Sequence, residues 1–125
     1  MVRSIIYTLV AIALCLGVFF GTQYYIDSRL GEVHDALETL YDKIEENTAT
    51  REDAYAVKAL WSDRKSKLQI FIPHNDISYV DYWLSEACAL IYNGEYELAL
   101  GKIEVLLEIT KNLPDAYTVK LENVF

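Results

Sequence analysis

An uncharged apolar run near the N-terminus constrains this chain more than any other feature. The 23 residues at positions 4–26 include no Asp, Glu, Lys or Arg. As a helix they extend about 34 Å, enough to cross a hydrocarbon layer of about 30 Å. Tyr7 near one end and Tyr24 and Tyr25 near the other suit the two membrane interfaces. We therefore expect residues 4–26 to form a transmembrane helix in contact with the lipid bilayer.

This run lacks the features of a cleaved signal peptide. Signal peptides have a shorter apolar region and small residues at positions −1 and −3 from the cleavage site. Here bulky residues occupy positions 18–20, and Leu14 directly before Cys15 disfavours lipidation of that cysteine. We expect the anchor to remain uncleaved.

The charges that flank the run predict its orientation. Arg3 and the α-amine precede it, whereas Arg29 follows it and the next lysine is Lys43. The positive-inside rule then places residues 1–3 in the cytoplasm and the C-terminal domain outside it, on a single-pass protein of the cell membrane.

Residues 27–125 are distinctly acidic. They hold all 19 acidic residues and ten of the eleven basic ones, which gives a net charge of −9. Such a surface repels phosphate groups, which argues against nucleic-acid binding and against a domain that lies flat on the membrane. Cys15 and Cys88 lie in different parts of the chain, so we expect no internal disulfide. Cys88 is expected to be a small buried residue.

Four amphipathic stretches follow in the acidic part. The first has apolar residues at alternating steps of three and four, and it predicts a stalk helix over about 28–47 that continues the anchor without a break. Its apolar residues are Leu30, Val33, Leu37, Leu40 and Ile44. Three further helices are predicted over about 51–72, 76–93 and 95–113, followed by a short C-terminal segment.

Local signals place the ends of these helices. Thr50 and Asp53 resemble a capping box, and Asn75 or Asp76 is expected to cap the third helix. Pro73 is expected to end the second helix.

The fourth helix is expected to close at Pro114. No alternating strand pattern occurs. The predicted fold class is all-α, with an N-terminal transmembrane helix continuing into a small antiparallel four-helix domain, either one bundle or two stacked hairpins.

Residues 80–113 look like one tetratricopeptide-type helical hairpin. The positions that agree are Trp83, Ala87, Gly94, Tyr96, Ala99, Ile103 and Leu107. Glu86 and Pro114 depart from that pattern, and residues 30–72 do not follow it. We interpret the likeness as a shared way of packing a hairpin and not as a repeat array.

A wider resemblance covers nearly the whole chain. Its features are the anchor, the helix with Trp61, the junction Phe-Ile-Pro-His-Asn-Asp-Ile at 71–77, the turn at 94–99 and the ending at 121–125. On these features the chain resembles the bacterial domain of unknown function 4363, a family of small proteins with an N-terminal membrane helix. The resemblance implies this architecture and a bacterial origin, and it implies no activity.

No group of residues predicts catalysis or metal binding. His74 and Asp76 are close in sequence, but the other histidine, His34, lies on the stalk, and a metal site needs three or four ligands. Paired acids such as Glu45 with Glu46 do not face each other on a helix. We expect no catalytic, cofactor-binding or metal-binding residue, and a protein that is not an enzyme.

Ten tyrosines are more than so small a core needs. Five of them are candidates for a partner-binding face: Tyr79, Tyr82, Tyr92, Tyr96 and Tyr117. The alternative is that they cover the edges of the hairpins. We expect a membrane-anchored protein-interaction or scaffold module with an unidentified protein partner. The alternatives are a self-associating component, hence a homo-oligomer, and a metal- or ligand-sensing domain.

Overall fold

The chain folds into four helices joined by short turns. The computed structural model describes the backbone of residues 1–122 and the side chains of residues 1–113. The helices are α1 (Val2–Glu45), α2 (Arg51–Leu68), α3 (His74–Tyr92) and α4 (Tyr96–Glu122). No strand occurs in the part of the chain with a described backbone. The all-α fold class is confirmed.

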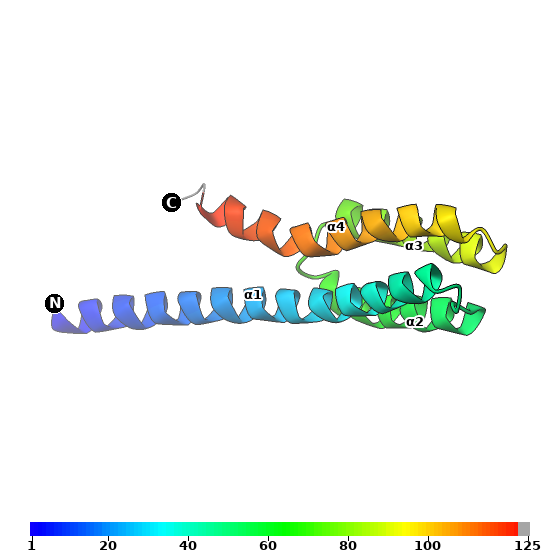
Figure 1. Cartoon of the computed structure of the whole chain (residues 1–125). Helices are drawn as coiled ribbons and strands as arrows, with labels where there is room; N and C mark the ends of the chain where they lie inside the picture. The colour runs from blue at the N-terminus through cyan, green and yellow to red at the C-terminus, as the bar shows by residue number, and fades with distance from the viewer. Residues whose placement is uncertain (123–125) are drawn as a thin grey trace.

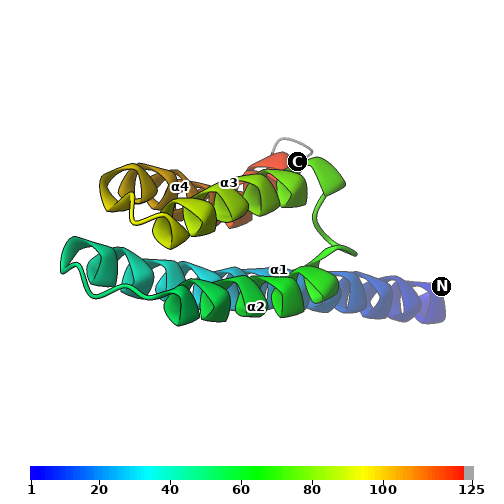
Figure 2. The ribbon, with the colours of Figure 1, turned by 90° about the vertical axis from the view of Figure 1, so that its right-hand side faces the viewer.

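The helices run alternately in opposite directions around one core (Figure 1). Consecutive helices pack against each other, and α4 returns to α1 and closes the ring. Figure 2 shows the two layers, with α1 beside α2 and α3 beside α4. Short turns between neighbouring helices favour this antiparallel arrangement, as the sequence predicts.

The two halves of α1 have different surroundings although the helix has no break. Its apolar half (residues 2–25) projects from one end of the bundle, and its most apolar stretch is long enough to cross a membrane and has no buried residue (Figure 1). Its bundle half (residues 26–45) forms one side of the core. The buried residues of α1 all lie in the bundle half, and they are Ile26, Leu30, Val33, Leu37, Leu40 and Ile44.

Every contact between neighbouring helices includes at least one polar pair. Each pair joins side chains at defined positions on two neighbouring helices and so favours one alignment of those helices. The pairs are Glu32–Arg64 and Lys43–Asp53 between α1 and α2, Trp61–Asp81 and Lys65–Asp81 between α2 and α3, Glu86–Lys102 between α3 and α4, and His34–Thr110 and Tyr41–Glu104 between α1 and α4.

The predicted capping box at the start of α2 is confirmed. The amide of Asp53 donates to Oγ1 of Thr50 at 3.2 Å, and the amide of Thr50 donates to Oδ2 of Asp53 at 2.9 Å. Lys43 of α1 also donates to Asp53, at 2.8 Å. The bond from Lys43, followed by the bond from the Thr50 amide, lowers the pKa of the Asp53 carboxyl. The cap therefore also joins α1 to α2.

The junction between α2 and α3 differs from the prediction. α2 ends at Leu68, whereas a helix to about 72 was expected, and the amides of Phe71 and Ile72 both donate to the carbonyl of Leu68 at 3.0 Å. This turn buries Ile72 in the core. The N-cap of α3 is Pro73, with φ −56° and no side-chain capping bond. The prediction that Asn75 or Asp76 caps this helix is therefore wrong. The ring of Pro73 fixes its φ near the value of a helix, which favours the start of α3 directly after it.

α4 does not stop at Pro114. It continues to Glu122, so the expected separate C-terminal segment is part of the same helix as far as the described backbone reaches. Proline has no N–H to donate to the carbonyl of Thr110, and a helix that contains it bends. Figure 1 shows the red end of α4 diverging from α1. Packing of the first part of α4 against both α1 and α3 offsets the loss of one hydrogen bond.

Candidate partner-binding face

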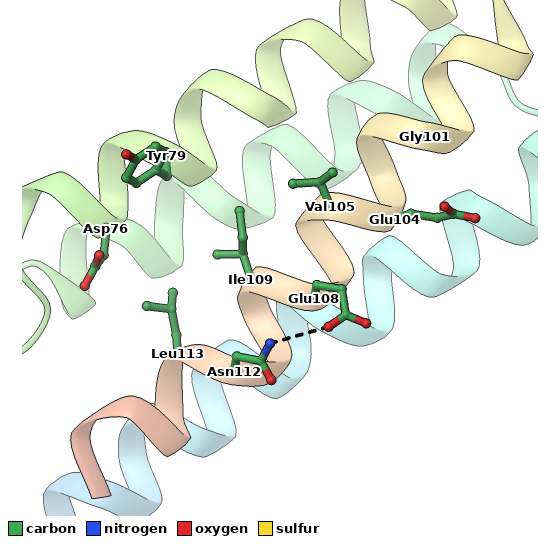
Figure 3. A pocket seen from close by; sticks show the side chains of 9 residues that line it. All are labelled: Asp76, Tyr79, Gly101, Glu104, Val105, Glu108, Ile109, Asn112 and Leu113. Atoms are coloured by element: carbon green, nitrogen blue, oxygen red, sulfur yellow. Dashed lines mark hydrogen bonds between the residues drawn. The ribbon is translucent and has the colours of Figure 1, made fainter. Parts of the chain in front are cut away.

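A groove of about 600 Å³ runs along α4 beside the first turns of α3. Val105, Ile109 and Leu113 form its floor, and their spacing of four puts them in one row on the helix. In Figure 3 these three side chains point toward α3, where Tyr79 and Asp76 form the opposite wall. The groove therefore has an apolar floor on α4, a wall on α3 and one side open to solvent.

Carboxylates border this apolar row. Glu104 and Glu108 extend from the other side of α4 in Figure 3, and Asn112 donates to Glu108 at 3.4 Å. The hydroxyl of Tyr41 on α1 donates to Glu104 at 2.9 Å. This bond is the main reason why the pKa of Tyr41 rises to about 12. Together with Asp76, these acids give the groove a negative border.

Two of the predicted tyrosines lie on the outer surface of α3 next to the groove. The side chains of Tyr79 and Tyr82 are 61% and 60% exposed. Tyr82 packs edge-on against Trp83, with the ring centres 5.9 Å apart, and Nζ of Lys102 lies 4.6 Å from the centre of the Trp83 ring. Lys102 also pairs with Glu86 at 3.1 Å. The aromatic surface beside the groove is thus held in place by α4.

The charges around this aromatic surface affect each other. The bond from Lys102, followed by the bond from Tyr82, lowers the pKa of Glu86. The same Glu86 carboxylate raises the pKa of the Tyr82 hydroxyl. Both groups therefore keep their ordinary charge states at neutral pH, with Glu86 ionised and Tyr82 neutral.

The other predicted tyrosines do not join this face. Tyr92 packs against Tyr55, with ring centres 5.3 Å apart, and the guanidinium of Arg51 lies 5.7 Å from the centre of the Tyr92 ring. Burial is the first cause that raises the pKa of Tyr92 to about 12. The hydroxyl of Tyr96 donates to the carbonyl of Ala49 at 3.3 Å. The side chain of Tyr117 lies outside the described residues. The alternative interpretation, that tyrosines cover hairpin edges, describes Tyr92 and Tyr96.

The residues considered for a metal site have other contacts. Nε2 of His74 lies 3.3 Å from the hydroxyl of Ser78, and Nδ1 of His34 lies 2.9 Å from that of Thr110. Among the residues with described side chains, no group of three or more His, Cys, Asp or Glu could hold a metal ion. The contact of His74 lies within α3, whereas that of His34 joins α1 to α4, so the two histidines do not meet.

The two cysteines lie in the environments that the sequence predicts. Cys88 is buried, with its sulfur 3.8 Å from the carbonyl of Ala54, and burial raises the pKa of its thiol. Cys15 lies on the exposed apolar half of α1. Both thiols are free.

Sequence reasoning missed the floor of the groove. The buried row of α4 includes Ala99, Ile103 and Leu106, and Val105 and Ile109 lie beside it, only partly covered. A second row with a spacing of four is visible in the sequence. The position of this row next to Tyr79 depends on how α3 packs against α4, and local sequence patterns do not predict that packing.

These features define a class of protein, an acidic four-helix bundle carried on a long apolar N-terminal helix. The family model Domain of unknown function (DUF4363) matches residues 20–124, and the chain belongs to this family. The family resemblance drawn from the sequence is therefore confirmed. The match does not bear on the tetratricopeptide-like hairpin, which stays a prediction. No curated protein and no solved structure matches the chain.

Proposed function

We propose that this chain is a single-pass protein of the cell membrane whose acidic bundle lies outside the cytoplasm and binds a protein partner without catalysing a reaction. One observation carries the proposal: α1 has an apolar half with exposed side chains and a bundle half that is part of the core. In water, so large an exposed apolar surface is unfavourable, whereas in lipid it is the expected exterior of a helix.

The membrane topology can be tested on the full chain by cysteine labelling. Cys88 is buried and Cys15 lies within the apolar half, so neither should react with a membrane-impermeant maleimide. Lys58 is exposed on α2, and a Lys58→Cys chain offers one accessible thiol on the bundle. We expect labelling of this variant in intact cells. Labelling only after the cells are opened would contradict the orientation, and recovery of the chain in the soluble fraction would contradict the anchor.

The groove and the aromatic surface beside it support the proposed binding role. An apolar row with a carboxylate border suits a segment with apolar residues on one side and Lys or Arg along its edges. Exposed Tyr79 and Tyr82 with the partly covered Trp83 are of the residue types that contribute most to protein interfaces. We infer that the partner presents a basic amphipathic segment to α3 and α4.

Site-specific photocross-linking tests this face in cells. A photoreactive phenylalanine at Tyr79 should give an adduct with a second protein. The matched control is Tyr55 on α2, which is 58% exposed and lies away from the groove. Equal adducts at both positions, or none at Tyr79, would contradict the proposed face.

Self-association through the anchor is a second candidate. The stalk row from Leu30 to Ile44 is buried in the chain's own bundle, so it is not free to pair with another copy. In the apolar half, Gly17 and Gly21 have open space around them and are four residues apart, a spacing that allows two membrane helices to approach closely. Oxidative cross-linking through Cys15, lost when Gly17 and Gly21 are replaced by Ile, would favour this candidate.

A further inference from the structure

The turn between α2 and α3 lies at the end of the bundle from which the apolar half of α1 emerges (Figure 2). Its outward-facing residues are apolar. The side chain of Ile70 is 82% exposed and that of Phe71 is 39% exposed, whereas Ile72 is buried in the core. The turn thus presents two large apolar side chains at the end of the bundle closest to the predicted transmembrane segment.

A direct contact places this turn level with the end of the apolar run. The rings of Phe71 and Tyr25 meet edge-on, with centres 5.9 Å apart. The guanidinium of Arg29, one turn further along α1, lies 5.2 Å from the centre of the Tyr25 ring. Tyrosine and arginine at the end of a transmembrane helix mark the interface between lipid and water. Phe71 therefore lies at the depth of that interface.

The charge distribution of the bundle agrees with this placement. Residues 64–75 contain no acid, and this is the longest acid-free stretch within residues 27–125. Arg64 and Lys65 are paired with acids of the bundle, and Lys67, half exposed, lies 3.5 Å from Asp63. Anionic headgroups repel acids and attract an exposed lysine at this depth.

The turns at the opposite end of the bundle are polar and acidic. The turn after α1 includes Glu46 and Asn47, and the turn after α3 is Asn93, Gly94 and Glu95. Asn47 and Gly94 adopt positive φ values of 58° and 75°, so these are tight polar turns. Among the three turns that join helices, only the one beside the apolar half exposes large aliphatic and aromatic side chains.

We propose that the α2–α3 turn is a second membrane contact, in which Ile70 and Phe71 enter the lipid interface beside the end of the transmembrane segment. The inference rests on the proposed membrane anchoring. With two contacts at one end, the bundle stands upright on the bilayer, and its acidic turns face away from the headgroups.

Nitroxide accessibility on the full chain in vesicles of phosphatidylcholine and phosphatidylglycerol tests this inference. Three chains each carry one spin label, at the native Cys15, at Ile70→Cys or at Leu98→Cys, with the other native cysteines replaced by Ala. Leu98 is the matched control, since it is an apolar residue 59% exposed near the opposite end of the bundle. Ile70 makes little contact with the protein, so its replacement should leave the helical content unchanged.

We expect oxygen, which concentrates in lipid, to relax the labels at 15 and 70 more than a water-soluble nickel chelate does, and the reverse at 98. A label at 70 that behaves like the one at 98, while Cys15 reports lipid, would overturn the second contact and leave the anchor intact. A label at Cys15 that reports water would overturn the proposed function itself.

Discussion

The apolar half and the bundle half of α1 are one continuous helix with two different exteriors. In the apolar half, large side chains such as Leu14 and Phe20 are exposed all around the helix. In the bundle half, the apolar residues are confined to one side, and His34, Glu38 and Thr39 face outward or toward polar partners. The comparison teaches that the distribution of apolar residues around a helix, and not the helix itself, determines whether protein or another apolar medium covers it.

The largest expected difference between the halves is in the stability of the bundle. Leu37 is fully buried, and Leu37→Ala should lower the free energy of unfolding by about 2–5 kcal/mol because it leaves a cavity. Leu14→Ala should leave it unchanged, since Leu14 contacts no part of the bundle. Urea unfolding of the full chain in mild detergent, followed by the fluorescence of Trp61 and Trp83, measures both. An equal decrease in the free energy of unfolding for both substitutions would contradict the conclusion that only the bundle half is part of the core.

The converse change tests the apolar half. Leu14→Arg places a charge near the centre of the predicted membrane span, at a cost to insertion of about 3 kcal/mol. Thr39→Arg in the bundle half lies on an exposed position and should not affect insertion. The measurement is the fraction of full chain that stays in the membrane pellet after alkaline extraction. Complete retention of the Leu14→Arg chain would contradict the placement of position 14 near the centre of the span.

Substitutions of two threonines should differ in their effect on bundle stability, by less than the leucine substitutions do. Thr110 is buried, and its hydroxyl contacts His34 of the bundle half, so Thr110→Val should cost about 1 kcal/mol of bundle stability. Thr8 donates only to the carbonyl of Ser4 in its own helix, at 2.8 Å. Thr8→Val should therefore not change urea unfolding. The contact of α1 with α4 would need revision if the two substitutions had the same effect.

The smallest effect concerns alkaline pH. A tyrosine whose pKa is higher in the folded than in the unfolded chain stabilises the fold fully below the unfolded pKa, and this contribution is lost as pH rises through the folded pKa. For Tyr41 the interval runs from pH 10 to about 12. Tyr41→Phe should therefore reduce the loss of stability over that interval.

Urea midpoints measured at several pH values across this interval test the assignment, with Tyr24→Phe in the apolar half as the control. Tyr92 has a pKa raised to about 12 by burial and should retain its own share of the pH dependence in the Tyr41→Phe chain. An unchanged slope in that chain would mean that the bond to Glu104 does not form in solution.

Much of the fold could be predicted because its signals are local. The spacing of Leu30, Val33 and Leu37 fixes one side of α1, and Thr50 with Asp53 fixes the start of α2. Each pattern involves residues within two turns of a helix, where side chains meet whatever the rest of the chain does.

Other features could not be predicted because they depend on distant residues. The early end of α2 follows from the burial of Ile72 in a core made by other helices, and α4 passes Pro114 because α1 and α3 support its earlier turns. Tyr79 and Tyr92 lie on the same helix. Tyr55 and Arg51 on α2 pack against Tyr92, whereas Tyr79 stays exposed. The candidate face was therefore identified only in part.

The lack of a break within α1 also fixes the direction in which the groove faces, as seen along α1, relative to the side chains of the apolar half. Because no hinge separates the two halves, the number of residues between them determines which side of the apolar half faces the same way as the groove. One residue inserted after Gly21 would rotate the bundle by about 100° relative to the residues before it. If the apolar half spans a bilayer as proposed, a partner in that bilayer would then meet another side of the bundle, although the bundle itself keeps its sequence after the insertion.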